Sequence, residues 1–181
     1  MKLIVGLGNP GKEYVATRHN IGCDVLSFLF DQWKKEKKLK GEISILPNMI
    51  GLFPTTFMNL SGEAVLATAN FYNIPTQDII VVHDDIDIPL ADVRIKKAGG
   101  HGGHRGVKSI IECLQSSDFT RVKCGVGRPH GEKSVIEHVL SQFNDDEKSI
   151  VQEMSNNAAS VILTLCKKDE PGSSSEEKDG S

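Results

Sequence analysis

Near the N-terminus, the residues most suited to binding or catalysis lie between Gly6 and Asn20, in the stretch GLGNPGKEYVATRHN. It follows an apolar run, Leu3–Val5, which predicts a buried strand. Asn9 offers an amide that both donates and accepts hydrogen bonds, and His19 is the side-chain type that titrates near neutral pH unaided. We therefore expect a tight loop at the end of a strand that presents Asn9 and His19 to a ligand.

The glycines of this stretch also fit a dinucleotide-binding pattern, Gly6-x-Gly8-x-x-Gly11. That pattern requires a helix that starts at the glycines and an acidic residue that ends a second strand about 20 residues further on. Pro10 interrupts the motif, and Asp31, which lies at the right distance, falls in a helical pattern. The loop interpretation is favoured over a nucleotide site.

Three polar residues, His83, Asp84 and Asp85, directly follow the apolar run Ile79–Val82. In an α/β sheet, ligands bind at the carboxyl ends of the strands. Because neighbouring side chains on a strand point to opposite faces, we expect at most one of the two aspartates to face a site there.

A glycine-rich loop, Gly99–Gly106, carries two further histidines. One interpretation of this region is a metal site, with candidate ligands His83, Asp84, Asp87, His101 and His104. Glycines do not fix ligand geometry, however, and the helical His-x-x-x-His spacing is absent. The loop N–H groups and the helix N-terminus that follows suit a phosphate better.

Charge is distributed unevenly along the 181 residues, although the net charge is only −3. The tail Asp169–Ser181 holds five acids and one base and so carries −4, which leaves +1 for the residues before it. Within these, Arg94–Arg128 holds eight basic and two acidic residues, a local charge of +6. Such a segment indicates a polyanion site, and a solvated charged face is the alternative.

The length predicts one domain, residues 1–168, followed by an acidic tail, 169–181, that lacks apolar residues and should be disordered. We expect no membrane span and no secretory signal, because neither pattern is present. The four cysteines are widely spaced in apolar patterns, which indicates free thiols in a reducing compartment.

Strand and helix patterns alternate through most of the chain, which predicts an α/β sandwich with a parallel or mixed sheet. Strands are expected at 3–5, 43–46, 49–53, 79–82, 93–97 and 122–126, and helices after 20, after 61, at 106–114, at 135–140 and from 144 onward. Asn20 and Ser61 are expected to cap their helices, and Lys34–Lys40 to be a solvated helix end.

Five motifs follow one another along the chain: 3–20, Pro54–Gly62, His83–Asp85 with Asp87–Pro89, Gly99–Gly106, and Val126–Pro129. Together they resemble the motifs of bacterial-type peptidyl-tRNA hydrolases, over most of residues 1–143. The resemblance implies a single-domain, three-layer α/β/α sandwich with a mixed, twisted sheet. It implies hydrolysis of the ester between a peptide and the 3′ ribose of tRNA, which recycles tRNA from aborted translation. It also implies a monomeric cytoplasmic enzyme that needs no metal or other cofactor.

The roles implied for the catalytic group suit the chemistry of its residues. His19 would be the general base that takes a proton from water. Asp84 would accept a hydrogen bond from the other ring nitrogen and favour the imidazolium that forms. Asn9, with Asn59, would bond amides of the peptide and so penalise a free, charged amine.

The remaining implied roles concern the tRNA. Tyr14 and Phe57 match positions near the 3′ end of the substrate. The bases that would bind tRNA phosphates, which supply affinity without base sequence, are Lys96, Lys108, Arg121, Lys123 and Arg128.

Arg105 departs from the family, which usually has asparagine after the second histidine of the loop. A guanidinium has no acceptor and carries a charge, so the role of the amide does not transfer to it. Arg105 either pairs with a phosphate near the 3′ end of the tRNA or turns to solvent.

Two other classes of function compete with this one. The first is a metal-dependent ester hydrolase built on His83, Asp84, His101 and His104. The second is a non-catalytic RNA-binding protein on the same fold, although the presence of His19, Asn9 and Asp84 together argues against lost catalysis.

Overall fold

The computed structural model describes residues 1–167. The predicted acidic tail, 169–181, lies outside the described residues. The strands are β1 (Lys2–Gly6), β2 (Lys34–Glu36), β3 (Gly41–Leu46), β4 (Met49–Pro54), β5 (Ile79–Asp85), β6 (Val93–Lys97) and β7 (Thr120–Gly125). The α-helices are α1 (Ile21–Leu26), α2 (Ser61–Phe71), α3 (Arg105–Leu114), α4 (Val135–Val139) and α5 (Lys148–Lys167). Single 3-10 turns are η1 (Lys12–Tyr14), η2 (Arg18–Asn20), η3 (Lys37–Leu39), η4 (Met58–Leu60) and η5 (Thr76–Asp78).

The described strands form one mixed sheet in the order β2-β3-β4-β1-β5-β7-β6. The central strands β4, β1, β5 and β7 are parallel to one another, whereas the pairs at both edges are antiparallel. The central strands β1 and β5 are almost fully buried, and their segments Leu3–Val5 and Ile79–Val82 are apolar, as expected for parallel strands covered on both faces.

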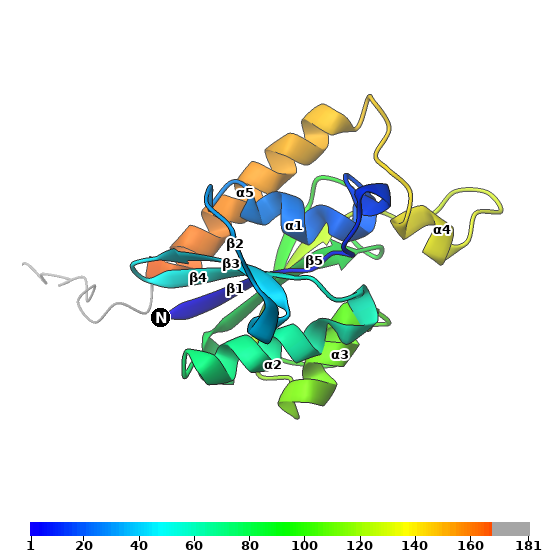
Figure 1. Ribbon diagram of the computed structural model, residues 1–181. Helices are drawn as coiled ribbons and strands as arrows, with labels where there is room; N and C mark the ends of the chain where they lie inside the picture. Colours follow the sequence, from blue (N-terminus) through cyan, green and yellow to red (C-terminus); the bar gives the residue numbers. More distant parts are fainter. Residues whose placement is uncertain (168–181) are drawn as a thin grey trace, which may run out of the picture.

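Helices cover both faces of the sheet, so the molecule has three layers (Figure 1). On one face, α2 and α3 pack over the cluster that contains Leu3, Val5 and Val81; on the other, α1 and α5 pack over Ile4 and Val82. Alternate residues of β1 and β5 thus enter opposite cores, which is the period-2 pattern of a strand. The predicted α/β/α sandwich with a mixed sheet is confirmed.

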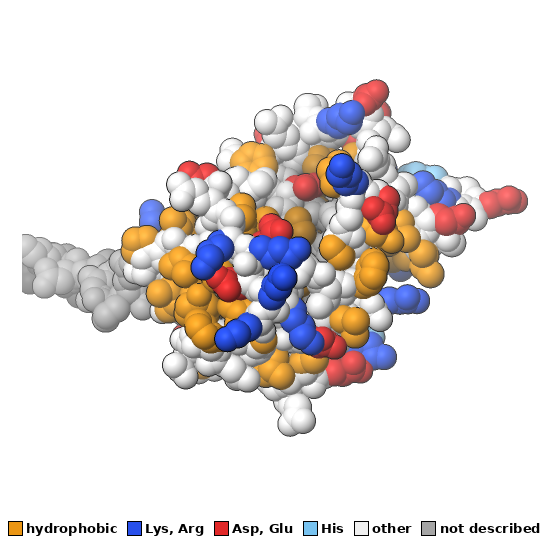
Figure 2. Space-filling model, in the orientation of Figure 1, with side chains coloured by type: hydrophobic (Ala, Val, Ile, Leu, Met, Phe, Trp, Pro, Cys, Tyr) orange, Lys and Arg blue, Asp and Glu red, His pale blue; other side chains and the backbone are white. Residues whose placement is uncertain are grey.

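The predictions for Lys34–Lys40 and for Ser61 were wrong. Lys34–Lys40 is not a helix end: it forms the edge strand β2 and the turn η3, and Figure 2 shows Lys and Arg side chains gathered over these elements. Lysines on an edge strand keep it solvated and oppose pairing with another chain. Ser61 does not cap α2; it is the first helical residue, and its hydroxyl donates to the carbonyl of Met58 at 2.8 Å.

The parallel strands bring distant parts of the sequence to one end of the sheet. Gly6 at the end of β1 lies beside Val82 in β5, and the Leu7 N–H continues the pairing to the Val82 carbonyl. The loop with Asn9 therefore emerges beside the residues that end β5. Within residues 1–167, no helix is long and apolar enough to cross a membrane.

Candidate active site

His19 lies on the turn η2, and both of its neighbours fix this turn. The guanidinium of Arg18 donates to the two carboxylate oxygens of Glu147, at 3.3 and 2.7 Å. The Asn20 amide donates to the carbonyl of Asn9 and accepts from its N–H, both at 2.9 Å. Asn20 stands at the expected cap position of α1, but its side chain makes no capping bond. Its amide instead joins the opening loop to η2.

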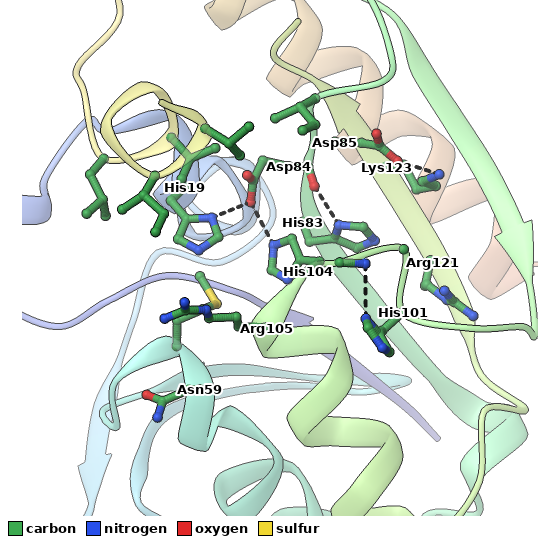
Figure 3. Close-up of a pocket in the computed structure, with 18 of the residues that line it drawn as sticks. His19, Asn59, His83, Asp84, Asp85, His101, His104, Arg105, Arg121 and Lys123 are labelled. Carbon is green, nitrogen blue, oxygen red and sulfur yellow. Dashed lines mark hydrogen bonds and ion pairs between the residues drawn. The ribbon is translucent and has the colours of Figure 1, made fainter. Parts of the chain in front are cut away.

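A buried carboxylate, Asp84, lies between two imidazoles. Its Oδ1 atom is 2.8 Å from Nδ1 of His19 and 2.8 Å from Nε2 of His104 (Figure 3). Asp84 is only 3% exposed, so these bonds form away from solvent. The arrangement can hold a proton-accepting histidine in one orientation, which is what general base catalysis requires.

The hydrogen bonds also settle which nitrogen of His104 carries the proton. His104 is the N-cap of α3, and its Nδ1 accepts from the Val107 N–H at 3.3 Å. The proton of the neutral ring therefore lies on Nε2, which donates to Asp84. His19 donates to Asp84 through Nδ1, so its Nε2 is free to accept a proton and is turned into the pocket (Figure 3).

Asp84 remains ionised in this setting. Burial alone would raise its pKa, but the charges and hydrogen bonds of His104 and His19 outweigh burial and hold the pKa below its usual range. An ionised Asp84 favours a positive charge on His19 after the ring takes up a proton.

A third histidine, His83, lies beneath this group. Its Nδ1 donates to the carbonyl of Asp84 at 2.7 Å, and its ring packs edge-on against His104 with centroids 4.7 Å apart. Burial, assisted by His104, lowers the pKa of His83 to about 3, against a smaller opposing effect of Asp84. His83 is therefore a neutral, buried part of the support for the carboxylate.

Asn9 presents a hydrogen-bond donor to the same cavity. Its Oδ1 accepts from the N–H of Met58 at 2.7 Å, which leaves the NH₂ group as its remaining capacity. Met58 belongs to η4, which also carries Asn59 into the pocket. A Cβ on Gly106 would lie 2.5 Å from the Met58 sulfur, so glycine lets the start of α3 approach η4 closely.

The two aspartates that end β5 have different partners. Asp85 forms an ion pair with Lys123, and burial, which would raise its pKa, is outweighed by the hydrogen bond from Lys123. Both Asp84 and Asp85 line the pocket, so the expectation that at most one would face it was wrong. The two side chains point apart, that of Asp84 toward His19 and His104 and that of Asp85 toward Lys123 (Figure 3).

Arg121 is placed differently from the phosphate contact predicted for it. It is 2% exposed, and its guanidinium donates to the carbonyls of Gly100, at 2.7 Å, and Gly99. This buried arginine therefore fixes the start of the glycine-rich loop. Lys96 and Arg105 line the pocket as exposed cations, whereas Lys108 and Arg128 lie outside its lining.

Two aromatic residues expected near the 3′ end of the substrate, Tyr14 and Phe57, contact one another, and Phe57 lines the pocket. The rings of Tyr14 and Phe57 are 6.5 Å apart in an edge-to-face arrangement, and Phe57 is 55% exposed. An exposed aromatic ring beside a pocket can stack a nucleic-acid base.

The cavity measures about 420 Å³ and gathers most of the predicted residues. Its lining includes Asn9, His19, Phe57, Asn59, Asp84, Lys96, Arg105, Arg121 and Lys123. Sequence reasoning missed the bond from His104 to Asp84, because the two residues are 20 positions apart and nothing in a glycine loop fixes such a distance. The one available signal was its place directly before a helical pattern, which is typical of an N-cap.

One trio in the described residues also has the composition of a metal site: His19, Asp84 and His104, with ligand atoms within 4.8 Å of one another. It is not the set expected from the sequence, because neither His101 nor Asp87 belongs to it. Each imidazole nitrogen lies 2.8 Å from the same carboxylate oxygen, which is a hydrogen-bond distance. A metal ion would have to replace both bonds.

Known proteins resemble this chain over nearly its whole length. The family model described as peptidyl-tRNA hydrolase matches residues 3–178. Peptidyl-tRNA hydrolase of Geobacillus thermodenitrificans is 46% identical over 160 residues, which cover 84% of this chain and 86% of the relative. That of Caldanaerobacter subterraneus subsp. tengcongensis is 43% identical over 177 residues, which cover 91% and 92%.

Among solved structures, the crystal structure of peptidyl-tRNA hydrolase from Acinetobacter baumannii matches with a TM-score of 0.85 at 34% identity, covering 93% of this chain and 89% of that one. The chain therefore belongs to the peptidyl-tRNA hydrolase family.

Proposed function

We propose that this chain hydrolyses the ester between a peptide, or an N-acylated amino acid, and the 3′ ribose of tRNA, with His19 as the general base. The observation that carries the proposal is the His19–Asp84 hydrogen bond at 2.8 Å, which leaves the second ring nitrogen of His19 open to the pocket. Family membership supplies the substrate class.

The reaction follows from the protonation states. Nε2 of His19 takes a proton from water as the oxygen bonds to the ester carbonyl carbon. The imidazolium, stabilised by Asp84, then returns the proton to the 3′ oxygen of the ribose as the carbon–oxygen bond breaks. The products are a peptide with a free carboxyl group and a tRNA with a free 3′ hydroxyl, so atoms and charge balance.

The amides that line the pocket suit the acyl side of this ester. The Asn9 oxygen already accepts from the Met58 N–H, so Asn9 offers its NH₂ group to the substrate. This donor fits a carbonyl oxygen of the peptide. Asn59 offers both a donor and an acceptor. A site of this kind favours an acylated amine over a free ammonium group, which cannot accept a hydrogen bond.

The basic residues suit the tRNA side, by contrast. Lys96 and Lys123 lie in the pocket, and Lys108 and Arg128 lie outside it, so basic side chains extend from the pocket onto the surface. Three of them also pair with acids: Lys123 with Asp85, Arg128 with Asp87 and Lys108 with Glu112. Tyr14 and Phe57 would receive the 3′ terminal base. We further propose that the enzyme acts as a monomer in the cytoplasm on the acceptor stem and 3′ end.

The test is release of free tRNA from an N-acylated aminoacyl-tRNA, with the unacylated compound as the control. We expect rapid hydrolysis of the first and little of the second. Equal rates on both would contradict the proposed role of the amides, and no release from either would contradict the activity.

Metal-dependent hydrolysis is a second candidate, and the cluster of His19, Asp84 and His104 favours it. Treatment with a chelator followed by removal of the chelator separates the two. We expect unchanged turnover, because the proposed reaction takes its proton acceptor from His19. Loss of activity that added Zn²⁺ restores would establish the metal-dependent alternative.

A further inference from the structure

Arg105 is a cation without a partner at the edge of the pocket. It begins α3, its side chain is exposed, and it lines the cavity. No hydrogen bond or ion pair joins its guanidinium to another of residues 1–167. Most other charged groups in the lining are already paired: Asp84 with His19 and His104, Asp85 with Lys123, and Arg121 with loop carbonyls. An unpaired guanidinium in such a place is available to a ligand.

The position of Arg105 relative to His104 identifies the part of the substrate that it meets. Figure 3 shows Arg105 between His19 and Asn59, whereas Arg121 and Lys123 lie on the other side of His104. The contact between Gly106 and Met58 holds the start of α3 against η4, the element that carries Asn59. Arg105 thus shares a side of the pocket with the amides and not with the paired bases.

We propose that Arg105 binds the carboxylate of an acidic side chain, Asp or Glu, in one of the two peptide residues nearest the ester. This proposal rests on the proposed function, because the amide side of the pocket is assigned there to the peptide. A guanidinium matches carboxylate in a two-pronged geometry. It matches phosphate equally well. The position beside Asn59, whose amide is assigned to the peptide, favours the carboxylate, and the experiment below separates the two anions.

The expected preference is modest. A hydrogen bond to a charged group is stronger than one between neutral groups, and exposure to solvent reduces its contribution. We therefore expect peptides with glutamate to be hydrolysed roughly 3–10-fold faster, in kcat/KM, than peptides with glutamine at the same position.

The experiment uses the full chain and four substrates, in which the same tRNA species carries one of four N-acetylated dipeptides. In acetyl-Ala-Glu and acetyl-Ala-Gln the variable residue bears the ester; in acetyl-Glu-Ala and acetyl-Gln-Ala it lies one residue further away. The measured quantity is the Glu/Gln ratio of kcat/KM within each pair. We expect a ratio above one in at least one pair, which Arg105→Gln reduces to one and Arg105→Lys retains in part.

Two further variants sharpen the result. Arg105→Glu should disfavour glutamate relative to glutamine, because like charges then meet. Lys38→Gln removes one exposed positive charge from η3, away from the pocket, and should leave the ratio unchanged. Because the ratio is taken within one variant, a general loss of stability or activity does not imitate the effect.

Two outcomes would overturn the proposal. If Arg105→Gln lowers kcat/KM equally for all four substrates and flattens the salt dependence, the arginine contacts a phosphate of the tRNA. If the wild-type ratio is one and no variant changes it, the Arg105 side chain does not select between peptide substrates. Failure of the proposed function would look different, because no substrate would then release tRNA.

Discussion

The molecule uses charge in opposite ways in two regions. One is the buried floor of the pocket, formed by Asp84 with His19, His83 and His104; the other is the set of exposed bases around the pocket, such as Lys108 and Arg128. Asp84 is 3% exposed and is held by two imidazoles at 2.8 Å, whereas Arg128 and its partner Asp87 have side chains that are 66% and 60% exposed. A buried charge must be matched by oriented partners, so its position is specific. An exposed ion pair contributes little and rearranges at little cost. The floor can therefore position groups for a reaction, and the exposed bases can adapt to the phosphate backbone of a nucleic acid.

The most severe way to break the floor is His19→Ala. We expect turnover to fall by roughly 10²–10⁴-fold or more, the range typical of general acid–base catalysis, because no other described side chain replaces its Nε2. The fold should be retained, because Arg18 and Asn20 fix η2 independently of the ring. Single-turnover hydrolysis of N-acyl-aminoacyl-tRNA measures the loss; near-normal turnover would remove His19 as the base.

Asp84→Asn should have the next largest effect. An amide oxygen can still accept from His19 and keep the ring in place, but it cannot stabilise the positive charge that forms. We expect a smaller fall in turnover than for His19→Ala. Asp85→Asn is the matched control one residue along β5, where the partner is Lys123. If Asp85→Asn were the more damaging change, the assignment of the two carboxylates would have to be exchanged.

The contrast between these regions also explains what the sequence could predict. The positions of Asn9 and Asp84 near the ends of two strands could be predicted from the apolar runs before them, and His19 lies in the stretch that follows the first run. The α/β class followed from the alternation of strand and helix patterns, and the three layers from the family resemblance. The bond from His104 to Asp84 and the one from Asn20 to Asn9 depend on tertiary distances that periodicity does not contain. The burial of Arg121 was missed for the same reason: charge counts describe a segment and not the direction of each side chain.

The exposed bases can be weakened one at a time with a smaller effect. Arg128→Ala should raise KM for full-length tRNA substrates severalfold with little change in kcat, and should reduce the salt slope of binding by about one phosphate contact. Lys108→Ala should behave in the same way. On a minimal substrate that carries only the terminal adenosine, both changes should be nearly silent. Equal damage on both substrates would place these residues in the catalytic centre.

The smallest effect at neutral pH concerns His83, which supports the floor without contacting the exposed bases. Its pKa is lowered from 6.5 to about 3, chiefly by burial, so the folded chain keeps this ring neutral. The unfolded chain takes up a proton at His83 below about pH 6.5. The contribution of His83 to stability is therefore complete above that pH and is lost as the pH falls from 6.5 toward 3, with a slope of up to about 1.4 kcal/mol per pH unit.

Chemical denaturation at several pH values, compared between the wild type and His83→Asn, tests this. Asparagine can still donate to the carbonyl of Asp84 and does not titrate, so the free energy of unfolding of the variant should fall less steeply between pH 6.5 and 3. The comparison is needed because burial raises the pKa of Asp24 from 3.8 to about 6, which contributes a slope of opposite sign between those values. In Asp24→Asn, the free energy of unfolding should accordingly fall more steeply on acidification than in the wild type. Parallel curves for the wild type and His83→Asn would mean that His83 keeps its ordinary pKa in the folded state, and a positive charge could then form beneath Asp84 as the pH falls.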